Sequence, residues 1–203
     1  MKKTKQDDSP KTVRRFRHPL RYVAIALCIA LFVVANMVLI FYFSSESKEE
    51  SGTRSTGVTV FVVRLLHPDY DFMDYNAQLA AVDDAHGLVR KAAHLLEYAL
   101  LGYLTASLML FLRRYMYRHR IDYWKTWFYP AEFSFLYAVT DEVHQIFSER
   151  GPSIRDVFID FAGAMIGICL IQLTVFLCSR IKKSYRKSHR KGKEPVCKPP
   201  VTV

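Results

Sequence analysis

The chain of 203 residues is long enough for one domain, carries a formal net charge of +10 and is 51% hydrophobic. A soluble protein this basic would suggest a nucleic-acid partner. Here the Lys and Arg residues flank long apolar stretches, so we expect membrane lipids as partners and no nucleic acid. The four cysteines show no CxxC spacing, which gives no support to a zinc site or a disulfide framework, and we expect no metal and no cofactor.

The first apolar stretch, residues 22–43, contains no charged residue and is long enough to cross the hydrocarbon core, which takes about 20 residues. A secretory signal would have a shorter apolar region of roughly 7–15 residues, followed by a small-residue cleavage site. Nothing of that kind follows Phe43. We therefore predict an uncleaved span behind a basic N-terminal segment, residues 1–21.

Residues 44–91 begin as a polar linker and contain two segments with helical or apolar character. Residues 58–66 form a short apolar run. In residues 75–89, side chains of one helical face recur every three or four positions, at Leu79, Val82, His86 and Val89. We expect both segments to lie on the membrane surface or to fold over the mouth of the helix bundle.

Three further spans are predicted at residues 92–112, 128–147 and 157–178. The least apolar of them, 128–147, carries Glu132, Asp141, Glu142 and His144. The Lys- and Arg-rich tail, residues 179–203, is expected to be disordered and attracted to lipid. The predicted fold class is all-α, a polytopic membrane protein whose residues 22–178 form a four-transmembrane-helix bundle with short outer amphipathic helices.

Lys and Arg residues set the orientation of the predicted bundle, because they accumulate in cytoplasmic loops. Residues 1–21 hold eight of them, the loop 113–127 holds five and the tail 179–203 holds nine. Segment 44–91 also holds five, spread among eight acidic residues, and loop 148–156 holds two. We therefore predict a multi-pass protein of the cytoplasmic membrane with both termini cytoplasmic, in which 44–91 and 148–156 face outward.

Four of the carboxylates inside the predicted spans lie at one level. Such residues cost about 2.5–3.5 kcal/mol each at mid-bilayer, so they need partners or a water-filled cavity. At about 1.5 Å per residue, Glu97, Asp141 and Glu142 lie roughly 8 Å below the outer surface. Asp160 lies about 5 Å below it, near the start of the last span. We therefore predict a shared polar pocket that opens outward.

The last span supports this pocket through its inward face. One helical stripe of this span carries Asp156, Asp160, Gly163 and Gly167. Gly163 and Gly167 form a GxxxG pair, which lets a second helix approach closely. Ser153 is placed to cap the helix, with Asp156 as its capping-box partner. Arg150 and Arg155 would stand at the rim of the pocket, where the planar arginine side chain suits phosphate or carboxylate.

Two motifs resemble those of the VanZ-like family. The first motif is Arg90-Lys91-Ala92-Ala93-His94-Leu95-Leu96-Glu97-Tyr98-Ala99-Leu100-Leu101-Gly102. The second is Asp141-Glu142-Val143-His144-Gln145, followed by Arg150, Ser153, Asp156, Asp160, Gly163 and Gly167. Ser44 and Ser45 resemble the family's serine signature, although Glu46 stands where the family often has glutamine. The resemblance covers about residues 25–175 and implies a membrane protein of the bacterial cell envelope. The family's namesake is associated with low-level resistance to teicoplanin, a glycopeptide antibiotic, which implies a context rather than a reaction.

The candidate site contains two predicted sets of residues. The predicted catalytic residues are His94, Glu97 and Glu142. The predicted substrate-binding residues are Lys91, Tyr98, Asp141, Gln145, Arg150, Ser153, Arg155, Asp156 and Asp160. In the alternative interpretation, these side chains join helices or neutralise one another, for example a glutamate with Lys91 or an arginine. A metal site built from His94, Glu97, Glu142 and His144 would lack any HExxH-type spacing.

Three functions are compatible with these residues. The first is binding or modification of an envelope component, such as a lipid-linked cell-wall precursor or a glycopeptide, with a link to teicoplanin resistance. A small proton-coupled transporter would need polar groups at several depths, whereas those found here are confined to the outer leaflet. A non-catalytic scaffold predicts that alanine at Glu97 or Glu142 lowers protein abundance and nothing else. No nucleophile motif, P-loop or dinucleotide fingerprint stands out, so whether the protein is an enzyme is left open.

Overall fold

The computed structural model describes residues 19–45, 48–117, 120–146 and 153–191, and within these ranges the chain is helical and contains no strand. The helices are α1 (Pro19–Ser44), α2 (Lys48–Leu66), α3 (Tyr75–Phe111), α4 (Lys125–Gln145) and α5 (Ile154–Lys191). A 3₁₀ turn, Tyr70–Phe72, precedes α3, and a π-helical turn, Leu112–Met116, follows it. The predicted all-α fold class is confirmed.

Three of the described helices are long and apolar enough to cross a membrane. The qualifying stretches are Leu20–Ser44, Tyr75–Met116 and Ile154–Arg186, which belong to α1, α3 and α5. α4 is not among them, because its 21 residues include Glu132, Asp141 and Glu142. The apolar helices are those of a membrane protein, and the span predicted at 128–147 stays a prediction.

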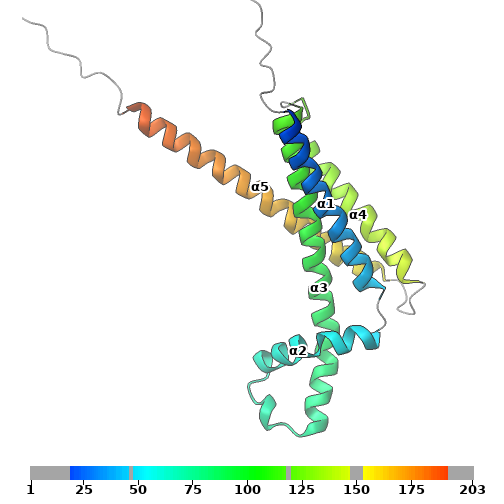
Figure 1. Ribbon diagram of the computed structural model, residues 1–203. Helices are drawn as coiled ribbons and strands as arrows, with labels where there is room; N and C mark the ends of the chain where they lie inside the picture. Colours follow the sequence, from blue (N-terminus) through cyan, green and yellow to red (C-terminus); the bar gives the residue numbers. More distant parts are fainter. Residues whose placement is uncertain (1–18, 46–47, 118–119, 147–152, 192–203) are drawn as a thin grey trace, which may run out of the picture.

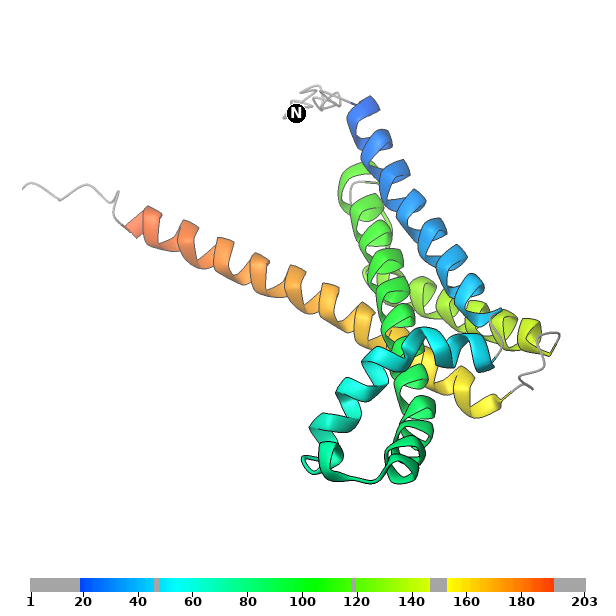
Figure 2. The same cartoon turned by 60° about the horizontal axis from the view of Figure 1, so that its bottom comes forward.

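α1, α3 and α4 lie side by side, and α5 crosses them at a steep angle (Figure 1). α5 contacts α3 and α4. Its C-terminal half projects away from the other helices in both views (Figure 2). Every described residue from 173 to 186 is exposed, which agrees with this projection. The contacts that build the protein interior are therefore concentrated in the first half of α5.

The apolar core between these helices is small. It contains one group of buried side chains, Val33, Ile40, Tyr98, Leu101, Ala138 and Ala164. Many large apolar side chains instead face outward, among them Leu31 and Phe32 of α1. An extended apolar surface of this kind is expected where the surroundings are lipid rather than water.

Glycines allow α3 and α5 to touch backbone to backbone. A Cβ atom at Gly163 or Gly167 would overlap backbone atoms of α3, and one at Gly102 would overlap the backbone of Ala164 on α5. The close approach predicted from the GxxxG pair is confirmed. Asp160, one turn before this crossing, is buried on the same inward side of α5.

α2 and the N-terminal part of α3 form a hairpin with a small core of its own. Val63 of α2, Tyr70 of the turn and Val82 of α3 are buried together. α2 begins at Lys48, earlier than the predicted apolar run. The segments predicted separately at 75–89 and 92–112 are one continuous helix. The chain there contains no proline, and one glycine costs a helix only about 1 kcal/mol, which is too little to end it.

α5 does not end at residue 178 as predicted, but continues to Lys191. Residues 179–191 contain neither proline nor glycine, and their Lys and Arg residues are good helix formers. The expectation of disorder is therefore wrong for this part of the tail. Residues 192–203 and the N-terminal residues 1–18 lie outside the described ranges.

Candidate functional site

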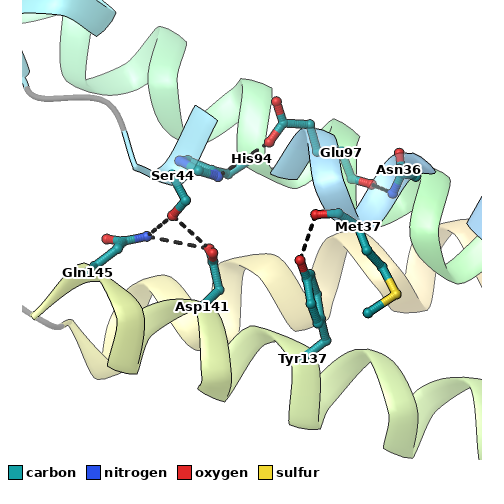
Figure 3. Close-up of polar contacts among 8 residues, drawn as sticks. All are labelled: Asn36, Met37, Ser44, His94, Glu97, Tyr137, Asp141 and Gln145. Carbon is teal, nitrogen blue, oxygen red and sulfur yellow. Dashed lines mark hydrogen bonds and ion pairs between the residues drawn. The ribbon is translucent and has the colours of Figure 1, made fainter. Parts of the chain in front are cut away.

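The C-terminal end of α1 joins α4 through buried hydrogen bonds. The Ser44 Oγ donates to Asp141 Oδ2 at 3.0 Å, and Gln145 Nε2 donates to Ser44 Oγ at 2.7 Å (Figure 3). Gln145 Nε2 also approaches Asp141 Oδ2 at 3.4 Å. Ser44 is fully buried, and Asp141 and Gln145 are nearly so. This network fixes one carboxylate of the predicted site between two helices.

Glu142, the next residue of α4, contacts the start of α5. The Ser153 backbone N–H donates to Glu142 Oε2 at 2.8 Å. A capping box would have brought the Asp156 carboxylate to this N–H, so the predicted partner is wrong. The Ser153 carbonyl accepts from the Asp156 N–H at 3.0 Å, as expected at the start of a helix. Glu142 thus ties α4 to the first turn of α5.

The predicted residues of α3 form charged pairs on the same side. Lys91 Nζ lies 3.6 Å from Asp156 Oδ1 and so links α3 to α5. His94 Nδ1 lies 3.5 Å from Glu97 Oε2, one turn along α3 (Figure 3). Lys91 therefore neutralises an aspartate of α5, whereas the alternative interpretation of the sequence paired it with a glutamate.

Asp160 of α5 has four other carboxylates as electrostatic neighbours. Its electrostatic neighbours come from three helices and are Asp141, Glu142, Asp156 and Glu97. We refer to these four residues together with Asp160 as the acidic cluster. Tyr98 is completely buried beside it, with Asp141, Asp160 and Glu142 as its neighbours. Carboxylates of α3, α4 and α5, which the rise per residue predicts at one level, are thus electrostatic neighbours in the structure.

Two buried polar side chains of this region lie next to each other. The Tyr98 hydroxyl is a donor and Asp141 is an acceptor, so the hydroxyl is placed to donate to the carboxylate. This pairing adds α3 to the contacts of Asp141.

The predicted site residues do not include Ser44, Ser45 or His144, which all lie at this end. Ser45 Oγ lies 3.1 Å from His144 Nε2, and the His144 ring stacks on Phe41 with 4.2 Å between ring centroids. The serine pair after the first span was the available signal for Ser44 and Ser45. The sequence offers His144 as a possible metal ligand, and in the structure this side chain contacts the end of α1.

α1 is also fastened to its neighbours deeper in the bundle. The Asn36 side chain donates to the Glu97 carbonyl at 3.3 Å, and the Tyr137 hydroxyl donates to the Met37 carbonyl at 2.6 Å (Figure 3). These contacts hold α1 against both α3 and α4, and no sequence pattern pointed to them.

The predicted arginine rim is only partly described. Arg155 is exposed in the first turn of α5, and Arg150 lies outside the described residues. Within the part of the chain that the structure describes, no group of three His, Cys, Asp or Glu side chains is arranged to hold a metal ion. The His94, Glu97, Glu142 and His144 set therefore does not converge as a metal site.

Apolar helices that meet around the buried carboxylates Asp141, Glu142 and Asp160 define a helical membrane protein with a polar centre. The sequence model of the VanZ/LLP1 family matches residues 25–176, and the chain belongs to this family. The match covers the same part of the chain as the predicted resemblance. No curated protein and no solved structure matches the chain.

Proposed function

We propose that this VanZ-like membrane protein binds or modifies an envelope or lipid-linked component in a polar pocket facing the outer side of the cytoplasmic membrane. The observation that carries the proposal is the meeting of polar residues from α1, α3, α4 and α5 at one end of the bundle. Each of these helices contributes a buried residue there, in order Ser44, Tyr98, Asp141 and Asp160.

The proposal includes α4 as a fourth membrane span. Its 21 residues rise about 32 Å, close to the hydrocarbon thickness of about 30 Å. Its polar side chains Ser134, Asp141 and Glu142 are buried, whereas Phe133 and Leu136 are exposed. A low average hydropathy is thus compatible with a lipid-facing apolar surface, because the polar side chains Ser134, Asp141 and Glu142 point into the protein.

The charge distribution supports an outward orientation of the site. Lys and Arg residues accumulate at the opposite end of the spans, in residues 113–127 and after residue 179. The acidic cluster lies where α1 and α4 end and α5 begins. Both termini are then cytoplasmic, and the hairpin of α2 with α3 is on the outer side.

His94, Glu97 and Glu142 are the groups proposed to move protons if the ligand is modified. Glu97 and His94 lie within 3.5 Å of each other and are partly exposed, so their proton can reach a ligand. Lys91 and the arginines Arg150 and Arg155 would attract an anionic headgroup.

Teicoplanin protection tests the proposal. The protein and its Glu97→Gln and Glu142→Gln variants are expressed in a glycopeptide-susceptible Gram-positive host, and killing by teicoplanin and vancomycin is compared at measured membrane abundance. We expect the parent to protect against teicoplanin and the two variants to lose that protection at equal abundance. Glu132→Gln is the matched control, because this α4 carboxylate is exposed and far from the cluster.

A scaffold role is the second candidate, favoured by the Ser44–Asp141–Gln145 network, which joins two helices. It predicts that the glutamine variants differ from the parent in abundance alone. If the well-expressed parent gives no protection at all, the link to glycopeptide resistance is wrong and the ligand must be sought among other envelope molecules.

A further inference from the structure

The part of α5 that follows Gln172 leaves the helix bundle. The buried Gln172 side chain donates to the Thr126 carbonyl of α4 at 3.1 Å, whereas every described residue from 173 to 186 is exposed. Figures 1 and 2 both show this part of α5 running at a steep angle to α1 and α3. A membrane that α1 and α3 cross is therefore met by the end of α5 at a shallow angle.

This end of α5 has two chemically different sides. One side carries apolar or aromatic residues at intervals of four, which are 49% to 68% exposed and are Leu173, Leu177, Ile181 and Tyr185. With 3.6 residues per turn, Lys182, Lys183 and Arg186 fall on the opposite side. Arg180 stands at the edge of the apolar side, with its guanidinium 5.8 Å or less from an aromatic ring, that of Phe176 at 5.6 Å. The segment is thus an amphipathic helix with a basic polar side.

The positive charge of this segment has no acidic counterpart nearby in the sequence. Residues 180–191 contain seven Lys or Arg, and residues 161–193 contain no Asp or Glu. A helix with one apolar and one basic side lies in the membrane interface, with its apolar side chains at the acyl boundary and its basic groups among the headgroups. Each Lys or Arg close to an anionic lipid surface adds to this attraction. The segment is therefore complementary to anionic lipid in both charge and polarity.

We infer that residues 173–191 of α5 lie in the membrane interface and bind the headgroups of anionic phospholipids. Ile181 and Tyr185 enter the acyl boundary, and Arg180 and Lys182, at its two edges, contact the phosphates. A second copy of the chain is a poorer occupant of the apolar side, because two such basic segments repel each other. The inference is independent of the proposed ligand, since it concerns the opposite end of α5 from the acidic cluster.

Spin labels on the two sides of α5 test this placement. Ile181→Cys on the apolar side and Ser179→Cys on the opposite side are made singly, in a full-length chain whose native cysteines are changed to alanine. Both positions are exposed. One chain is placed in each nanodisc, which excludes a second copy, in phosphatidylcholine with or without phosphatidylglycerol. Electron paramagnetic resonance then measures the access of oxygen, which concentrates in lipid, and of a neutral nickel chelate, which stays in water.

In nanodiscs with phosphatidylglycerol, the label at position 181 should be reached by oxygen and protected from the nickel chelate. The label at position 179 should show the reverse. Arg180→Gln and Lys182→Gln should each lower the ratio of lipid-buried to water-exposed label at 181 by about fivefold. Salt at about 1 M should also lower it, because the Debye length falls to about 3 Å. Arg120→Gln is the matched control, since this arginine is exposed in the connection between α3 and α4.

Equal access of the nickel chelate to both labels in phosphatidylglycerol would overturn the inference, because the end of α5 would then project into water. Equal protection of position 181 in phosphatidylcholine alone would overturn it as well, since anionic headgroups would then play no part. A ratio that falls as much in Arg120→Gln as in Lys182→Gln would show a general effect of net charge and would contradict binding by this segment.

Discussion

Ser44 satisfies two buried groups with one hydroxyl. Its Oγ donates to Asp141 and accepts from Gln145, so both α4 side chains depend on the last residue of α1. Without this hydroxyl, Asp141 Oδ2 loses its 3.0 Å bond and keeps a longer contact with Gln145, at 3.4 Å. Loss of one partner from a buried network leaves the other groups unsatisfied, which costs more than the net value of the bond.

Ser44→Ala is therefore expected to lower the free energy of unfolding by about 1–3 kcal/mol. Ser45→Ala is the matched control, because the neighbouring serine is exposed and its loss should cost less than about 1 kcal/mol. Equilibrium unfolding in detergent micelles measures both. Equal losses in the two variants would contradict the assignment of Ser44 as the residue that joins α1 to α4.

The level of the charged side chains was predictable, and their partners were not. The rise per residue and the ends of the spans place Asp141, Glu142 and Asp160 at one depth, and the structure brings them together. The same arithmetic cannot tell which helix lies next to α1, so the role of Ser44 was missed. For the same reason the sequence predicts a partner for the Ser153 N–H within its own helix, whereas this N–H donates to Glu142 of α4.

The crossing of α3 and α5 determines where the cluster forms. Gly167 and Gly102 bring the two backbones into contact. Asp160 lies on the same inward face of α5, so the crossing also determines where its carboxylate lies. A side chain at the crossing would push the helices apart and move the carboxylates with them. Close packing through small residues is the usual way for membrane helices to associate.

Gly167→Ala should lower the free energy of unfolding by about 1–3 kcal/mol. Its Cβ would overlap backbone atoms of α3, which cannot move aside. Gly87→Ala is the control on α3, where a Cβ would meet nothing within 4 Å. That substitution should stabilise the helix by about 0.5–1 kcal/mol. Unfolding in detergent compares them, and a neutral Gly167→Ala would show that the helices do not touch at this glycine.

The ends of the helices were less predictable than their positions. Apolar content identifies the part of a helix that lies in lipid, so 92–112 and 157–178 were located, but it says little about where a helix begins or ends. α3 extends toward its N-terminus through an amphipathic segment, and α5 extends through a basic one. Neither extension contains a residue that would interrupt a helix, except for Gly87, which α3 tolerates.

The molecule has three strongly apolar helices, and beside them lies α4, whose carboxylates Asp141 and Glu142 are buried. In α4 the buried side carries Asp141 and Glu142, and the exposed side carries residues such as Phe133 and Leu136. Its average composition resembles that of a soluble helix, although each side is suited to its surroundings. The path of the chain depends on α4, because an outward-facing cluster with both termini cytoplasmic requires it to cross the membrane.

Cysteine labelling in intact cells tests this arrangement most directly. Single cysteines replace Asp122, before α4, and Arg155, after it, in a chain whose native cysteines are changed to alanine. Both positions are exposed. A membrane-impermeant maleimide should label the cysteine at 155 in intact cells, and the cysteine at 122 only after permeabilisation. Labelling of both from the same side would show that α4 does not span the membrane, and labelling in the reverse order would place the acidic cluster on the cytoplasmic side.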